Sequence, residues 1–222
     1  MRVAALFSGG KDSTYAAYVA MQRGWEVTHL VTIRPQDPDS MMFHVPNLHL
    51  TPLLAEAMGI PLVTAEAEAG EEGELGALRE SLKGLQVDGV VVGAVASDYQ
   101  HSRVNRVSHG LGLRVFAPLW RLDPERLLRD YLAAGMRIRI VGAFAEGMGP
   151  EWLGRELDET AVTDLLRLHR QKGVNPVGEG GEYESLVVDA PFFRKRLEIT
   201  GEDRHWEGQR GAVMFTANLV DW

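Results

Sequence analysis

The chain has 222 residues, of which 45% are hydrophobic and 24% charged, and this balance is typical of a globular protein with a sizeable core. A formal net charge of −8 argues against a broad electrostatic contact with RNA or DNA, so we expect no direct nucleic-acid partner. No apolar run reaches the roughly 18 residues that a membrane-spanning helix needs, and no cleavage-like site follows the apolar N-terminal stretch, so we expect no membrane association and a cytoplasmic protein.

The sequence contains no cysteine. This absence excludes disulfides, thiolate metal sites and chemistry that carries a persulfide on the chain. The seven histidines are scattered along the sequence. We therefore expect no protein-built metal centre.

The first half of the chain alternates strand-like and helix-like segments. Strands are expected at 3–7, 26–33, 61–64, 89–93 and 114–116, and helices at 13–23, 47–58, 71–83 and 99–110. Asn47 is a possible N-cap of the second helix, and Gly59 ends it. The pattern predicts an α/β fold with a Rossmann-like parallel sheet and helices on both faces.

The run Phe116 to Trp120 interrupts this periodicity and indicates a lobe boundary. We place a nucleotide-binding domain at 1–117 and a substrate-binding lobe at 118–222, sharing a core. In the second lobe we expect helices at 124–134 and 159–172, with strands at 137–144, 185–188, 196–200 and 212–219. This composition predicts a smaller α+β lobe.

The motif Ser8-Gly9-Gly10-Lys11-Asp12-Ser13 lies between the first strand and the first helix. Glycines there allow successive N–H groups to face one anion at a helix N-terminus, and the lysine and serines add a charge and donors. It is not a Walker loop, which needs a glycine where this chain has Ala5. The simpler alternative is a Gly-Gly turn beside a solvated lysine. At the carboxyl edge of a parallel sheet, Gly93 to Ser97 are expected beside the motif.

The segment Gly178 to Ser185 has the sequence Gly-Glu-Gly-Gly-Glu-Tyr-Glu-Ser. It is either a flexible acidic surface loop or a loop that presents carboxylates to magnesium, ammonium or a cationic substrate. Because Glu182 and Glu184 are two residues apart, an extended backbone would project both from one strand face.

The first motif resembles the PP-loop of the ATP pyrophosphatase superfamily, which has a HUP-type Rossmann-like domain and cleaves ATP between its α and β phosphates. Taken with the acidic segment, the chain resembles the diphthine–ammonia ligase family over nearly its whole length. Further residues of this chain occur in the same order as the motifs of that family. They are Ser97-Asp98-Tyr99-Gln100, Arg103, Leu111-Gly112-Leu113, Pro118-Leu119-Trp120, Gly154 and Asp189-Ala190-Pro191-Phe192. Asn105 departs from the pattern, because a glutamate is usual there, and this change removes a carboxylate near the expected pocket.

The resemblance implies an amide ligase that uses ATP and Mg²⁺ to adenylate a carboxylate, diphthine on translation elongation factor 2, and then displaces AMP with ammonia. Without a cysteine, the nitrogen must come from free ammonium or a separate subunit. Candidate catalytic residues are Lys11, Glu182 and Glu184. Candidate nucleotide-binding residues are Ser8, Gly9, Gly10, Lys11, Asp12, Ser13, His44 and Gly93. Candidate substrate-binding residues are Ser97, Tyr99, Gln100, Arg103, Glu179, Gly180, Gly181 and Tyr183.

Two other functions stay open. One keeps the adenylation but transfers ammonia to a small cobalamin-related carboxylate. The other is a sensor that binds ATP or AMP without chemistry, although Lys11 and the acidic segment would not be needed for binding alone. A homodimer is a further possibility that the sequence does not decide.

Overall fold

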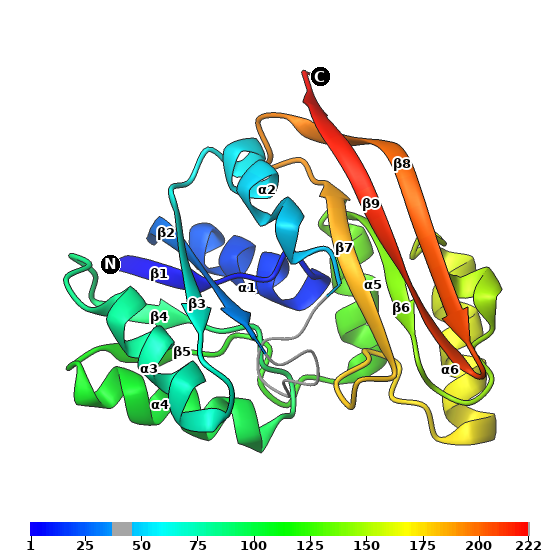
Figure 1. Ribbon diagram of the computed structural model, residues 1–222, viewed down its shortest axis with the longest axis horizontal. Coiled ribbons are helices and arrows are strands. Elements are labelled where there is room, and N and C mark those ends of the chain that lie inside the picture. The colour runs from blue at the N-terminus through cyan, green and yellow to red at the C-terminus, as the bar shows by residue number, and fades with distance from the viewer. Residues whose placement is uncertain (37–45, 222) are drawn as a thin grey trace.

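A computed structural model gives the fold over residues 1–36 and 46–221 (Figure 1). The elements of the N-terminal half are β1 (Arg2–Leu6), α1 (Lys11–Gln22), β2 (Glu26–Pro35), the 3-10 helix η1 (Leu48–Leu50), α2 (Thr51–Met58), β3 (Leu62–Ala67), α3 (Glu71–Leu82), β4 (Gly89–Val91), α4 (Asp98–Gly110) and β5 (Arg114–Phe116). Those of the C-terminal half are α5 (Pro124–Ala133), β6 (Arg137–Ala143), the 3-10 helix η2 (Pro150–Trp152), α6 (Glu159–Lys172), β7 (Tyr183–Asp189), β8 (Arg196–Glu207) and β9 (Arg210–Val220).

The first sheet is parallel, with the strand order β3-β2-β1-β4-β5. In the central strand, Ala5 pairs with Leu30 on one side and Val91 on the other. The strand order reverses next to β1, and ligands bind at this kind of position in open α/β sheets. The predicted Rossmann-like parallel sheet is confirmed.

Both faces of this sheet are covered by helices. Val3 and Ala5 pack on one face with the alanines of α1, whereas Ala4 and Leu6 pack on the other with the leucines of α3 and the valines of α4. This alternation follows from the strand period of two. It explains why β1 reads as a continuous apolar run.

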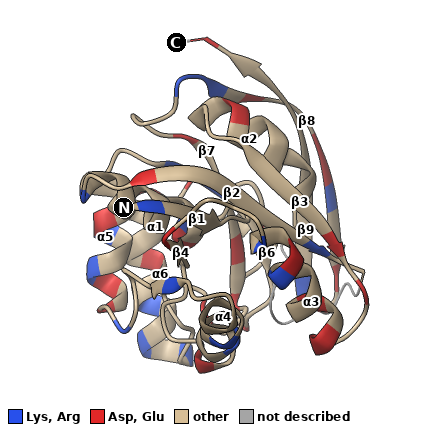
Figure 2. Cartoon of the chain, turned by 90° about the vertical axis from the view of Figure 1, so that its left-hand side faces the viewer, with Lys and Arg blue, Asp and Glu red and all other residues tan. Residues whose placement is uncertain are grey.

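The second sheet is antiparallel in the order β7-β6-β9-β8 and lies beside the first (Figure 1). Acidic and basic residues are interspersed over α5 (Figure 2), where Arg129 pairs with Glu125 at 2.9 Å and with Glu159 of α6 at 3.1 Å. The predicted α+β character of the C-terminal lobe is confirmed.

The β8–β9 hairpin is longer than the sequence pattern predicts. Its strands run to Glu207 and from Arg210, whereas the apolar stretches suggested only 196–200 and 212–219. The outer half of β8 is mostly exposed and carries charged residues. The sequence there therefore lacks the alternation of apolar residues by which a strand is predicted.

The expectation that Asn47 caps a helix is wrong. Its backbone is left-handed, with φ 71°, and its side chain makes no capping bond. The Asn47 amide instead donates to the Val213 carbonyl at 2.8 Å and accepts from the Phe215 N–H at 2.7 Å. Asn47 therefore joins the N-terminal half to β9. Gly59 ends α2 in a left-handed conformation, as predicted.

One continuous apolar core runs from the first sheet into the second. It contains Val3 and Leu54 from the N-terminal half and Leu128, Val187 and Val213 from the C-terminal half. The boundary at residue 117 therefore does not separate two independent cores. Within 1–36 and 46–221, no helix is long and apolar enough to cross a membrane.

Candidate active site

The Ser8–Ser13 motif forms the turn between β1 and α1. Gly9 has a φ of +80°, and a Cβ added to it would lie 2.6 Å from Leu54 Cδ1, so both backbone conformation and space require glycine. The Ser8 and Ser13 hydroxyls lie 3.2 Å apart, and Ser8 Oγ accepts from the Gly10 N–H at 3.3 Å. The loop is therefore shaped locally, and α1 begins without a side-chain cap.

The edge of β7 lies against this loop. The Val187 N–H donates to the Gly9 carbonyl at 2.9 Å, and the Lys11 N–H donates to Ser185 Oγ at 3.2 Å. Ser185 is buried and was not among the predicted site residues. Because 174 residues separate Ser185 from Lys11, only tertiary structure could reveal this contact.

Lys11 is almost completely buried, with 3% of its surface exposed. Its Nζ donates to the Val177 carbonyl at 2.6 Å and to Asp12 Oδ2 at 2.9 Å, and it lies 4.8 Å from the centre of the Tyr183 ring. Burial opposes the charge of Lys11, but Asp12 above all raises its pKa above the ordinary value. Lys11 therefore stays a cation. Because its side chain is buried, it is not the solvated lysine of the simpler alternative.

Asp12 connects the motif to α5. The Tyr131 hydroxyl donates to Asp12 Oδ1, and burial raises the pKa of Tyr131 well above its ordinary value. Tyr131 is fully buried and was missed by the sequence analysis, because nothing in a helical pattern marks one buried tyrosine as a partner of the loop.

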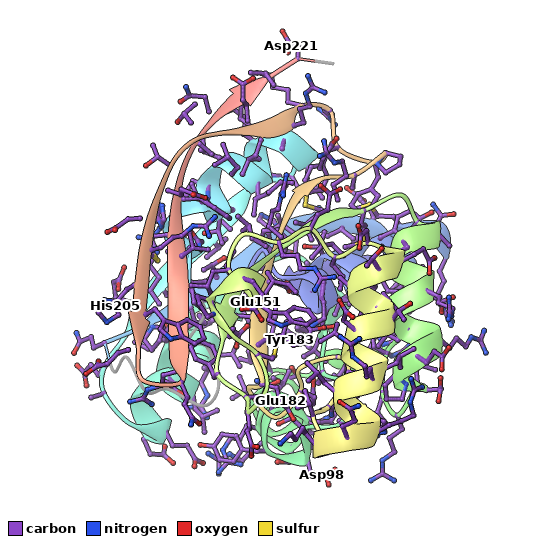
Figure 3. All side chains as sticks on the ribbon, turned by 90° about the vertical axis from the view of Figure 1, so that its right-hand side faces the viewer. Asp98, Glu151, Glu182, Tyr183, His205 and Asp221 are labelled. Atoms are coloured by element: carbon purple, nitrogen blue, oxygen red, sulfur yellow. The ribbon has the colours of Figure 1, made fainter. Side chains whose placement is uncertain are left out.

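The acidic segment is ordered by its own backbone. Glu182 accepts from the Asn175 N–H at 3.1 Å and from the Gly180 N–H at 2.8 Å. Gly181 has a φ of +80°, which favours glycine. Figure 3 labels Glu182 and Tyr183, which lead into β7. Both Glu182 oxygens are therefore already used as acceptors, and the segment does not behave as a freely moving acidic loop.

Glu179 links this segment to the start of α4. One oxygen, Glu179 Oε1, accepts from the N–H groups of Val95, Ala96 and Ser97 at 3.1, 2.8 and 2.7 Å. Burial raises the pKa of Glu179, while the N–H of Ala96 opposes the rise. The contact joins residues more than 80 positions apart and holds the segment against the carboxyl edge of the first sheet.

We expect Glu179→Ala to lower the free energy of unfolding by about 1–3 kcal/mol, because three N–H groups lose a shared acceptor. Glu179→Gln keeps an acceptor oxygen and should lose less. Denaturant titration measures both. The control is Glu202→Ala, which removes an exposed pair with Arg204 and should cost less than about 1 kcal/mol. Equal losses in the two alanine variants would contradict the proposed link.

Glu184 differs from the other two acidic residues. It pairs with Gly142 across β6 and β7, and among the described residues its carboxyl has no hydrogen-bond partner. Burial raises the pKa of Glu184 to about 8; Lys11 opposes this rise, and Asp12 and Glu179 add to it. Glu184 is thus a carboxyl group that can take up or release a proton near neutral pH.

This pKa predicts a pH-dependent stability. The folded state holds the Glu184 proton up to about pH 8, whereas the ordinary pKa of a glutamate side chain is 4.5. Folding therefore binds a proton between these pH values, and the free energy of unfolding should fall as pH rises from about 4.5 to 8. Chemical denaturation across this range should show a smaller fall in Glu184→Gln. An unchanged slope would show that Glu184 is already ionised at neutral pH.

The α4 residues divide into two groups. Ser97 caps the helix, accepting from the Gln100 N–H at 3.2 Å. Arg103 lies over the Tyr99 ring at 3.3 Å and pairs with Glu71 of α3, which lowers the pKa of Glu71. Tyr99 and Arg103 therefore form a cluster with α3 and, within the described part of the chain, make no hydrogen bond or ion pair with Lys11 or the acidic segment. The Asn105 amide donates to the His101 carbonyl at 2.7 Å.

Gly93 lies where β4 meets the motif. A Cβ there would come within 2.7 Å of the Ser13 nitrogen, so glycine permits close packing against the start of α1. His44 lies outside the described residues. Tyr183 is buried, and its hydroxyl donates to the Pro176 carbonyl at 2.9 Å. The structure thus brings together the motif, Gly93, Ser97 and the acidic segment.

The site fits an anionic phosphate ligand better than a protein-bound metal. The glycine backbone and the buried Lys11 cation supply the donors and charge that phosphates need. Over the described part of the chain, no group of three or more His, Cys, Asp or Glu side chains is arranged to hold a metal ion. Any Mg²⁺ would therefore depend mainly on oxygens of the phosphates.

Comparisons with known proteins identify the family of this chain. The family model of the diphthamide synthase N-terminal domain matches residues 1–115, and that of the C-terminal domain matches 123–219. The chain is 35% identical to the diphthine–ammonia ligase of Mus musculus over 98% of this chain and 87% of the mouse protein. It is 34% identical to the human protein of the same name over 91% and 84%, respectively. The chain belongs to the diphthamide synthase family.

The family assignment confirms the expected enzyme class, an ATP-dependent ligase. The diphthine–ammonia ligase of Schizosaccharomyces pombe is 33% identical over 91% of this chain but only 37% of the yeast protein. Among solved structures, a chain described as a predicted subunit of tRNA methyltransferase from Methanocaldococcus jannaschii aligns with 86% of this chain at 16% identity and a TM-score of 0.45.

Proposed function

We propose that this protein adenylates the carboxylate of diphthine on translation elongation factor 2 and converts it to the amide with ammonia, releasing AMP and pyrophosphate. The observation that carries the proposal is that a buried lysine at a glycine-built loop occurs together with a carboxyl, Glu184, that has no hydrogen-bond partner among the described residues and whose charge Lys11 and Asp12 influence. This reaction requires two things of the protein, groups that bind the phosphates and a group that accepts a proton.

In the first step, a carboxylate oxygen bonds to the α-phosphorus of ATP, and the bond from that phosphorus to the pyrophosphate oxygen breaks. The motif's N–H groups, Lys11 and Ser13 would hold the leaving pyrophosphate and offset its growing charge. Bound Mg²⁺ would supply further charge neutralisation, and Asp12 is the motif carboxylate that would hold it. Tyr131 and Ser185 are positioning residues here, because they hold Asp12 and the Lys11 backbone.

In the second step, ammonium gives a proton to Glu184, and the ammonia nitrogen attacks the acyl carbon. The bond from that carbon to the AMP oxygen breaks, AMP leaves, and the new amide nitrogen releases its surplus proton to water. With a pKa of about 8, Glu184 accepts this proton in the molecules in which it is ionised, and their share grows as the pH rises toward 8. Glu182 was predicted for the same role, but its oxygens are engaged with the loop backbone. We therefore propose Glu184 as the catalytic base and Glu182 as the residue that shapes the segment.

The proposal is tested by incubating the protein with ATP, ammonium and elongation factor 2 that carries diphthine. We expect AMP in equal amount to amide, measured by chromatography and by the mass of the modified peptide. ADP as the product would overturn the PP-loop mechanism. AMP formed only with a small carboxylic acid would move the acceptor to that class, and nucleotide binding without turnover would favour a sensor.

A further inference from the structure

The aromatic residues that sequence analysis placed in the substrate site are already engaged. Arg103 covers the Tyr99 ring, and Lys11 faces the ring of the buried Tyr183. Trp120, which the sequence analysis named only among the family's motifs, also stacks on His101, with ring centres 4.2 Å apart. Each of these rings therefore already has a cationic or aromatic partner.

Phe144 is different, because it is exposed and lies beside Glu184. It directly follows β6 and has 37% of its surface exposed, an unusual fraction for a phenylalanine. The Phe144 N–H donates to the Glu182 carbonyl at 2.9 Å. Its backbone is therefore fixed to the acidic segment.

Gly142 shows where the Phe144 ring lies. A Cβ added to Gly142 would come within 2.6 Å of Phe144 Cζ and 3.3 Å of Glu184 Cβ. The ring therefore folds back over Gly142, next to the stem of Glu184, in space that any side chain at position 142 would occupy. Among the described residues, no aromatic or cationic side chain stacks on this ring.

The charge around Phe144 suits a cation. The segment to which its N–H is bonded carries Glu179 and Glu182, and Glu184 adds a negative charge when it releases its proton. A quaternary ammonium group cannot donate a hydrogen bond, so an aromatic face with nearby negative charge is the environment that stabilises it.

We propose that Phe144 receives the quaternary ammonium group of the acceptor and is a specificity-determining residue of this ligase. The inference rests on the proposed function, because diphthine carries a trimethylammonium on the carbon attached to its carboxyl group. A cation on Phe144 would thus place the carboxylate next to Glu184. Because residue 142 is a glycine without a side chain, the Phe144 ring has room to lie in this orientation.

The first experiment measures binding without turnover. A 4-fluorophenylalanine at position 144 is followed by fluorine NMR while tetramethylammonium is added, and tert-butanol serves as the neutral probe of similar shape. We expect a saturable shift with tetramethylammonium and none, or a much weaker one, with tert-butanol. Equal responses to the two probes, or no response, would overturn the assignment.

The second experiment uses turnover with the methylated acceptor protein. We expect Phe144→Leu to raise the KM for the acceptor about 5- to 30-fold, with kcat and the KM for ATP nearly unchanged, because one cation–π contact is lost. Phe144→Trp should keep a low KM. The control is Met214→Leu, an exposed apolar residue of β9 without a π-face, which should leave the KM unchanged.

The two proposals fail in distinguishable ways. An active wild-type enzyme with an unchanged KM in Phe144→Leu would overturn the subsite alone. A wild-type protein that makes no AMP with the methylated acceptor, yet shows the saturable tetramethylammonium shift, would overturn the proposed function and leave the cation site standing.

Discussion

Replacing Lys11 with methionine is expected to lower the rate of AMP formation by about 10²- to 10³-fold, the cost of removing one preorganised charge from a site of phosphoryl chemistry. Methionine is apolar and unbranched, so the loss would report the charge of Lys11 rather than a gross change in packing. Lys11 is the buried cation of the motif, and no water-exposed lysine could replace it at that position. The measurement is single-turnover release of AMP with saturating acceptor.

Loss of stability must be separated from loss of chemistry in this variant. Without Lys11, Asp12 keeps its bond from Tyr131 but loses its ion pair, and the free energy of unfolding should fall by up to about 3 kcal/mol. Adding Asp12→Asn removes the unpaired charge and should restore much of that stability without restoring turnover.

The matched surface control is Lys172→Met, which breaks an exposed pair with Glu146. Its AMP formation should equal that of the wild type. If the Lys11 variant, folded under assay conditions, kept wild-type turnover, our assignment of Lys11 would be wrong.

Replacing Glu184 with glutamine is expected to slow amide formation by about 10²-fold, because general-base catalysis typically contributes that much or more. Formation of the adenylate should be far less affected, since Glu184 acts on the nitrogen nucleophile. Isotope exchange between pyrophosphate and ATP in the presence of acceptor measures the first step, and amide mass measures the second.

The pH profile gives a second readout for Glu184. Its pKa is raised to about 8, so the basic form accumulates as pH rises through that value and the rate with ammonium should rise with it. Ammonium itself also loses its proton at higher pH. Hydroxylamine, which is unprotonated at neutral pH, should therefore give a flat profile and a similar rate in Glu184→Gln.

The comparison variant for this test is Glu182→Gln. One of its atoms can no longer accept from the backbone, so we expect a less stable segment rather than a changed pH profile. If Glu182→Gln abolished the rise with pH and Glu184→Gln did not, the roles of the two glutamates would be reversed.

Much of the fold of the first half could be predicted, because its strands, helices and turns are specified by residues that are close together in the sequence. The run from Val3 to Phe7 packs on both faces of a parallel sheet, and Gly9 has the positive φ that such a turn needs. The second half was harder for a physical reason. The outer part of β8 faces solvent, so its charged residues carry little of the alternation by which strands are recognised.

The sequence by itself determined the fold class, the position of the Ser8–Ser13 loop and the acidic segment as a candidate site, because each depends on residues close together in the chain. The enzyme class followed from the family resemblance, which the order of motifs along the chain carries. Only the tertiary structure decided how the acidic residues differ. Glu179 accepts from N–H groups more than 80 residues away, Glu182 from its own loop, and Glu184 from no described partner. A carboxyl group's hydrogen bonds and burial set its pKa, and distant segments supply both.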